Sequence, residues 1–236
     1  MAFLSFAFVA CLPCRHVDEV FRKILLPVLI LLCGVPSLSA QVTPYEYKGL
    51  WYVSIQGGAS YFNGDDAHIY RLQGQWWTPV GASGALSGGY NIANGHELRL
   101  SAAFGKKNAS RVTYKEELHP YSFQSVSIFA DYALAFLSLA ENFNPFNPKL
   151  YLGAGCAYSF NFDNPWSPEL PVHDSNWVPA FHFGTILEYD FPSGLGLFAD
   201  IGLCFYDDPY DGQGRHSFVL DMDVGLNFGV IYHIKQ

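Results

Sequence analysis

The chain has 236 residues, of which 50% are hydrophobic, 17% are aromatic and only 14% are charged, and its formal net charge is −8. Charged residues make up about a quarter of a typical soluble domain, so the composition argues against an ordinary soluble surface. The acidic balance argues against a nucleic-acid-binding surface. Beyond the N-terminal region, the chain has none of the runs of roughly 20 apolar residues that form a membrane-spanning helix.

The N-terminal region has the pattern of a signal peptide. A basic pair at 22–23 precedes an apolar core at 24–33, and small residues follow at 36–40. We therefore expect residues 1–40 to be a signal peptide that is cleaved near Ala40. A second apolar patch lies ahead of the basic pair, and this suggests an alternative start of the chain near Val20.

After a short polar segment at 41–49, interpreted as a periplasmic lead-in, apolar and polar residues alternate in successive segments. Such alternation predicts β-strands with a different environment on each face. The predicted strands are 51–61, 81–93, 97–104, 125–134, 150–160, 181–190, 197–205 and 218–234.

The last strand, 218–234, has the clearest pattern. Every second residue from Leu220 to Ile234 is apolar, whereas the other face carries Asp221, Asp223, two glycines and an asparagine. A soluble β-barrel or sandwich would instead expose Lys, Glu and Thr on its polar face. Small and acidic residues opposite an unbroken apolar face are typical of a strand between lipid and a narrow polar lumen.

The connections alternate in length. Long polar segments follow the first, third, fifth and seventh strands, at 63–80, 107–120, 163–176 and 207–216. Asn94-Gly95 predicts a tight type I′ hairpin turn, 192–194 predicts another tight turn, and 138–148 is of intermediate length. The chain is therefore predicted to be all-β, with an eight-stranded antiparallel up-and-down transmembrane β-barrel over residues 50–236.

Aromatic residues near the predicted strand ends are expected to form the two interfacial belts of the barrel. These residues are Trp51, Tyr61, Tyr90, Tyr121, Tyr151, Phe160, Trp177, Tyr189, Phe205 and Tyr232.

Three stretches carry a resemblance to a known class of proteins: LYLGAGCAYSF after a Pro-Asn turn, SLSAQ at the predicted cleavage site, and the final LNFGVIYHI. The chain resembles the small eight-stranded outer membrane β-barrel proteins that are common in Bacteroidota. It is similar in architecture to the OmpA transmembrane domain and to PorT-type barrels. Many such barrels end on an aromatic residue, whereas this chain ends Ile234-Lys235-Gln236, so Tyr232 is expected to take that role.

Charged residues on the inward faces form the densest polar constellation. Arg99 is interpreted as the sole inward-facing Arg or Lys within a strand, and it is expected to meet Glu188 or Asp131. Three hypotheses follow: a structural plug of ion pairs, a pore gated by Arg99, or a site for protons or cations. The predicted lumen network consists of Glu97, Arg99, Asp131, His182, Glu188, Asp190, Asp200, Asp221, Asp223 and His233.

Other candidate sites are weaker. Asp207, Asp208 and Asp211 have ligands suited to Ca²⁺ but match no defined loop, so they are interpreted as solvated acids. His216-Ser217 lacks an assignable orienting carboxylate. The sequence therefore predicts no catalytic residues, no cofactor and no metal site. Loop tryptophans are candidates either for contact with a ligand or partner or for seating the loops at the lipid interface: Trp76, Trp77, Trp166 and Trp177.

The sequence predicts an integral protein of the cell outer membrane, embedded in lipid, with a structural or interaction role. The outer loops are expected to contact an envelope or extracellular protein, and no nucleic acid is expected as a partner. Alternative functions are a narrow gated pore for ions or small solutes and an accessory barrel in secretion. A lipid-modifying enzyme is the least favoured hypothesis, and the chain is expected not to be an enzyme.

Overall fold

The computed structural model describes residues 49–64, 70–72, 75–77, 80–112, 118–137, 145–163, 176–212 and 220–234. All of them belong to the compact unit Val42–Gln236. The predictions for residues 1–40 and for the lead-in up to residue 48 lie outside the described part of the chain.

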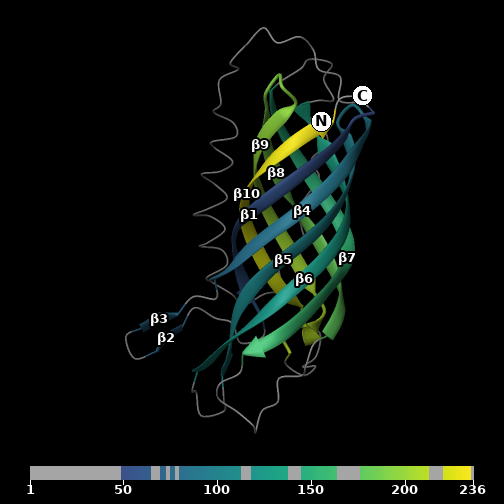
Figure 1. Cartoon of the computed structure of the whole chain (residues 1–236). Coiled ribbons are helices and arrows are strands. Elements are labelled where there is room, and N and C mark those ends of the chain that lie inside the picture. Colours follow the sequence, from purple (N-terminus) through teal and green to yellow (C-terminus); the bar gives the residue numbers. More distant parts are fainter. Residues whose placement is uncertain are drawn as a thin grey trace, which may run out of the picture. The chain divides into compact units, whose positions relative to one another are not determined.

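Eight antiparallel strands form a closed barrel, in which neighbours in the chain are paired and the last strand pairs with the first (Figure 1). Two smaller features come between barrel strands in the order of the chain: a separate two-stranded sheet after the first strand and a short 3₁₀ helix before the last strand. In the part of the chain that the structure describes, no helix is long and apolar enough to span a membrane. The elements are β1 (Trp51–Asn63), β2 (Tyr70–Leu72), β3 (Gln75–Trp77), β4 (Val80–Ala93), β5 (His96–Val112), β6 (Leu118–Ala135), β7 (Phe146–Asp163), β8 (Asn176–Asp190), β9 (Leu195–Tyr206), η2 (Asp208–Asp211) and β10 (Asp221–Ile234).

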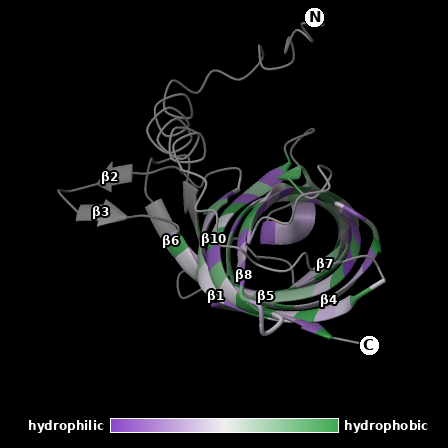
Figure 2. Ribbon diagram, turned by 90° about the horizontal axis from the view of Figure 1, so that it is seen from above, coloured by the Kyte–Doolittle hydropathy of each residue, from purple (hydrophilic) through white to green (hydrophobic). Residues whose placement is uncertain are grey.

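The barrel is apolar outside and polar inside, the reverse of a soluble barrel. Hydrophobic and hydrophilic residues alternate along the strands (Figure 2). Leu152 and Phe228 on the outside are 64% and 63% exposed, whereas Glu188 and Asp200 on the inside are 1% and 2% exposed. Exposing this much apolar surface to water is unfavourable. The inside–outside assignment predicted from the last strand, and with it the predicted fold class, is confirmed.

Most strands are longer than predicted, although the last one begins at Asp221 instead of Phe218. β5 has 17 residues and β6 has 18, and they stay paired as far as Val112 opposite Leu118. The predicted loop 107–120 is therefore wrong at both ends. The predicted connection 138–148 is wrong at its C-terminal end, because β7 begins at Phe146. About 9–11 residues suffice to cross a bilayer. Many of the extra residues are polar, yet their backbone groups still pair across the sheet.

The hairpin between β4 and β5 differs from the predicted turn type. Gly95 has a φ of 76°, but within the described residues the non-glycine residue with positive φ is Asn161, so Asn94 does not share this conformation. A type I′ turn requires positive φ at both central residues. The register instead shifts between Asn91 and Ala93. A bulge next to a left-handed glycine supplies the twist that the I′ turn was predicted to supply.

Two of the aromatic residues assigned to the interfacial belts lie inside the barrel. Tyr121 is 7% exposed and Tyr151 is 3% exposed, whereas Trp51 and Trp177 are 54% and 64% exposed on the outer surface. The reason is parity, because each inward tyrosine stands an even number of positions from other inward residues on its strand. Nearness to a strand end alone does not determine the face.

Glycines on one strand make room for large inward side chains on the next. A Cβ placed on Gly89 of β4 would lie 2.2 Å from the ring of Tyr52, its pairing partner on β1. A Cβ on Gly153 of β7 would lie 1.9 Å from Asp131 Oδ1 on β6. Gly88, one position before Gly89, offers a contrast, because its Cβ would meet only the Tyr52 carbonyl oxygen at 3.8 Å.

We expect Gly89→Ala to destabilise the barrel by about 1–3 kcal/mol, because the added methyl group overlaps a ring that cannot retreat inside a filled lumen. Gly88→Ala is the matched control and should change stability little. The measurement is the temperature at which the folded form is lost on gels of unboiled samples heated stepwise. Equal losses for both variants would contradict the steric argument.

Candidate functional site

The interior of the barrel is filled in three layers. A cluster at the end of the short turns contains Glu188 and His233, and it is called the turn-end cluster. A network around Arg99 occupies the middle, and it is called the mid-barrel network. An aromatic group around Tyr210 fills the other end and is called the loop-end plug. Every polar group in these layers is removed from bulk water, so its partners decide whether its burial is tolerated.

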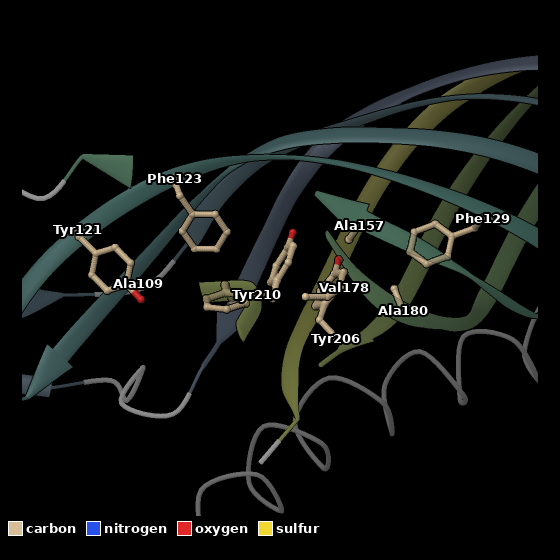
Figure 3. Close-up of a cluster of buried hydrophobic side chains, with 10 residues drawn as sticks. Ala109, Tyr121, Phe123, Phe129, Ala157, Val178, Ala180, Tyr206 and Tyr210 are labelled. Atoms are coloured by element: carbon tan, nitrogen blue, oxygen red, sulfur yellow. The ribbon is translucent and has the colours of Figure 1, made fainter. Parts of the chain in front are cut away.

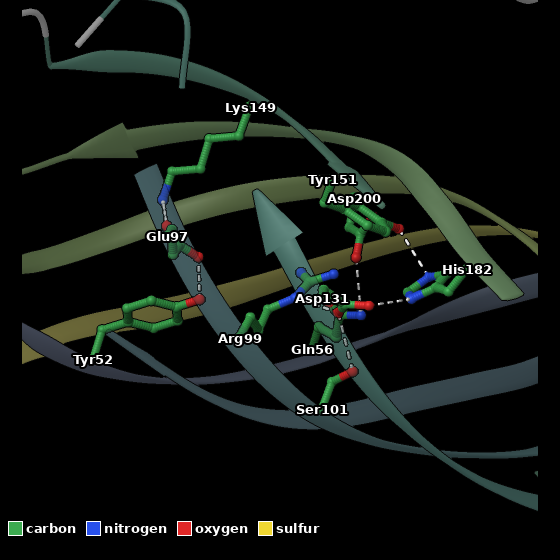
Figure 4. Close-up of polar contacts among 10 residues, drawn as sticks. All are labelled: Tyr52, Gln56, Glu97, Arg99, Ser101, Asp131, Lys149, Tyr151, His182 and Asp200. Atoms are coloured by element: carbon green, nitrogen blue, oxygen red, sulfur yellow. Dashed lines mark hydrogen bonds and ion pairs between the residues drawn. The ribbon is translucent and has the colours of Figure 1, made fainter. Parts of the chain in front are cut away.

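The turn-end cluster is built around one lysine. Lys149 Nζ of β7 lies 2.8 Å from Glu97 Oε2 of β5 and 2.9 Å from Glu188 Oε2 of β8. Tyr52 donates a hydrogen bond to Glu97 from the opposite side (Figure 4). His233 completes the cluster, with its Nε2 3.4 Å from Glu188 Oε1 and 3.3 Å from Asp190 Oδ1.

The mid-barrel network centres on Asp131. Arg99 Nε donates to Asp131 Oδ2 at 2.8 Å, and His182 Nδ1 lies 3.5 Å from Asp131 Oδ1. The other side of the His182 ring meets Tyr151, whose hydroxyl lies 2.9 Å from His182 Nε2 and donates to Asp200 Oδ1 at 2.9 Å (Figure 4). The Arg99 guanidinium also lies over the Tyr151 ring, 4.2 Å from its centroid. Charge-assisted and cation–π contacts together hold Arg99 in place.

Beside the mid-barrel network, serines and glycines leave a small cavity of about 60 Å³. Ser83, Ser101 and Ser127 are among its lining residues, together with Arg99 and Asp200. A space of this size with polar walls holds a few water molecules and excludes larger solutes.

The loop-end plug is aromatic. Phe62, Phe123 and Tyr210 are each 0% exposed, and their rings meet edge-on or tilted at centroid distances of 5.4 to 5.9 Å. Phe123 and Tyr210 are shown with their neighbours in Figure 3. Tyr210 comes from η2, which lies inside the ring of strands (Figure 2). Burial raises the pKa of Tyr210 above its usual value, so its phenol stays neutral. Tyr121 secures η2 by donating to the Asp211 carbonyl oxygen at 3.0 Å.

The structure places every residue of the predicted lumen network on the inner face of the barrel. The predicted pairing of Arg99 with Asp131 is present, whereas Glu188 pairs with Lys149 instead. The prediction that Arg99 is the sole inward cation within a strand is wrong. Lys107 and Lys149 are 5% and 3% exposed and point inward as well. Lys107 lies in the predicted connection 107–120 and Lys149 lies just before the predicted strand 150–160, although strand parity would have placed both inside.

Two of the residues that the sequence analysis assigned to loops lie elsewhere in the structure. Trp177 is the second residue of β8 and faces outward, so it belongs to the barrel surface rather than to a loop. Asp211 is 1% exposed, so the interpretation of the last acidic loop as fully solvated is wrong for this residue. Its backbone N–H donates to Asp221 Oδ2 at 3.1 Å. The side chains of Trp76, Trp77 and Trp166 and the pair His216-Ser217 lie outside what the structure describes.

No family model matches the sequence, and no curated protein matches it. Solved structures that resemble it are small outer membrane β-barrels. Neisserial surface protein A shares 15% identity, with 77% of this chain and 96% of that chain covered and a TM-score of 0.47. The attachment invasion locus protein Ail of Yersinia pestis, solved with the heparin analogue sucrose octasulfate, shares 16% identity over 79% of this chain and 99% of that chain, with a TM-score of 0.45. A major outer membrane protein of Thermus thermophilus shares 14% identity, over 78% and 99% of the two chains, with a TM-score of 0.47.

Adjacent lysines at the loop end of β5 offer a test of the buried pairs. Lys107 Nζ pairs with Asp223 and donates to Ser60 Oγ at 2.8 Å, whereas the side chain of Lys106 is exposed on the outer face. We expect Lys107→Met to cost about 3–5 kcal/mol, because it leaves a buried carboxylate without its cation. Lys106→Met should change stability little. Denaturant titration of the two variants folded in detergent measures the difference, and similar midpoints would contradict this account of the lumen.

Proposed function

We propose that this chain is an integral outer membrane protein with a sealed lumen, and that it acts through contacts made by its outer loops. The observation that carries the proposal is the filling of the barrel interior. The Lys149 ion pairs close one end and the rings around Tyr210 close the other. A molecule that passes nothing through its lumen has only its two ends with which to act.

Membrane insertion is supported by the outer surface of the barrel. Leu100, Leu152 and Phe228 are each more than 60% exposed, on strands that are not consecutive in the chain. The apolar surface therefore continues around the barrel rather than forming one patch for a protein partner. Because the sheet is closed, lipid meets no unpaired backbone groups along the barrel strands. The predicted signal peptide supports export to the outer membrane.

A contact role also fits the asymmetry of the barrel ends. One end carries tight connections, such as Asn94-Gly95 and residues 191–194, whereas the other carries the long connections after β1, β5, β7 and β9. Short turns are periplasmic and long loops are external in barrels of this kind. We infer that the long connections form the contact surface for a partner protein, and that the chain has no catalytic activity of its own.

The first experiment is fractionation of cells that produce the full chain, followed by gels of boiled and unboiled membrane samples. We expect the protein in the outer membrane fraction, with a faster-migrating form before boiling, because a closed barrel resists detergent. A soluble protein without this shift would overturn the proposed membrane location.

The second experiment measures ion conductance of the folded protein in planar lipid bilayers. We expect no unit conductance steps from the wild-type protein or from Arg99→Ala. The variant removes one ion pair from the middle of the lumen but leaves the Lys149 pairs and the ring of Phe123 in place. If Arg99→Ala opens conductance steps, Arg99 gates a pore and the sealed-lumen proposal is wrong.

A further inference from the structure

Three atoms of the kind that bind metals converge inside the turn-end cluster. They are Glu188 Oε1 and Asp190 Oδ1 of β8 and His233 Nε2 of β10. The imidazole nitrogen lies 3.4 Å from the first and 3.3 Å from the second, and all three atoms lie within 4.8 Å of one another. The three residues are only 1%, 3% and 1% exposed, so bulk water does not separate them.

The spacing matches tetrahedral coordination better than it matches direct hydrogen bonding. An N–H···O hydrogen bond has a heavy-atom distance of about 2.9–3.0 Å. Zinc binds nitrogen and oxygen ligands at about 2.0–2.1 Å, which in a tetrahedron separates ligand atoms by about 3.3–3.4 Å. Both contacts of His233 Nε2 fall at this separation.

Glu188 supplies a second, independent observation. Its Oε1 atom is fully buried and accepts no hydrogen bond from the part of the chain that the structure describes. Leaving a buried carboxylate oxygen in this state is costly unless another ligand satisfies it. The other oxygen of the same carboxylate is held by Lys149 Nζ at 2.9 Å, which fixes the orientation of Oε1 toward His233. Groups that orient a ligand in this way are a regular part of metal sites.

The fold builds this arrangement across an intervening strand. β9 separates β8 from β10 in the sheet, and its Gly196 pairs with Asp190 on one side and with Ile231 on the other. A Cβ at Gly196 would lie 2.5 Å from Asp190 Oδ1. The absence of a side chain on β9 at this level is what lets the carboxylate of β8 reach the imidazole of β10.

We propose that Glu188, Asp190 and His233 bind a divalent transition-metal ion, with Zn²⁺ as the ion that fits. Nitrogen and carboxylate ligands suit this ion, and a water molecule takes the fourth position. The bound ion ties β8 to β10 across β9 at the turn end of the barrel.

The test is metal analysis of the full mature chain, folded in detergent with excess Zn²⁺ and then desalted. We expect one Zn²⁺ per wild-type chain, and loss of this Zn²⁺ in His233→Asn and in Glu188→Gln. His182→Asn is the matched control, because His182 is also an inward histidine beside a carboxylate but lies in the mid-barrel network. It should keep its Zn²⁺.

A readout on the wild-type protein keeps the proposal testable if the variants fold poorly. A ligand that binds only the folded state raises its stability in proportion to the logarithm of its concentration. We expect Zn²⁺ to raise the temperature at which the unboiled, fast-migrating form disappears, and we expect EDTA to reverse the shift. A wild-type protein that retains no Zn²⁺ and shows no shift overturns the proposal. So does equal loss of Zn²⁺ from His182→Asn and His233→Asn, which would indicate binding elsewhere.

Discussion

The structure depends on one constraint: each charge that points into the barrel must find its partner inside the barrel. Lipid surrounds the proposed barrel, and bulk water does not reach the buried side chains of its interior. A buried carboxylate is costly unless a cation or several donors contact it. Asp131 meets Arg99 and Glu188 meets Lys149, and these residues come from four different strands. Strand register, barrel closure and side-chain pairing are therefore satisfied together or not at all, since a shift of one residue would turn every inward charge toward lipid.

The space inside the barrel is also divided between strands, because a large side chain on one strand lies opposite glycines on nearby strands. Tyr151 occupies the volume opposite Gly184 and Gly202, because a Cβ on either glycine would lie within 2.6 Å of its hydroxyl oxygen. The same principle places the Tyr52 ring over Gly89. Glycines that look like weak points in a strand sequence are thus the positions that admit the aromatic and charged side chains of the lumen. The result is an interior packed around a small polar cavity.

In the proposed sealed barrel, function would rest on the two ends of the molecule. The rings that fill the loop end include Tyr210 of η2, which belongs to the connection after β9. Part of that connection therefore lies inside the barrel instead of facing outward. The turn end is filled by charged side chains, with Lys149 held between Glu97 and Glu188 and with His233 beside Glu188 and Asp190. The two ends therefore differ in kind, one aromatic and the other charged.

The sequence by itself determined the fold class, because a period of two over eight segments and alternating connection lengths leave few architectures open. It also identified the inward acids and Arg99, since those residues fall within strands whose parity is clear. Lys107 and Lys149 were missed because polar residues beyond the apolar layer look like loop residues, although they continue the strands. Only the tertiary structure decided which charges meet, since partners such as Glu97 and Lys149 are 52 residues apart in the chain. It also brought η2 into the lumen and set Glu188, Asp190 and His233 around one point. Closure of the barrel fixes such distances, and no local pattern in the chain encodes them.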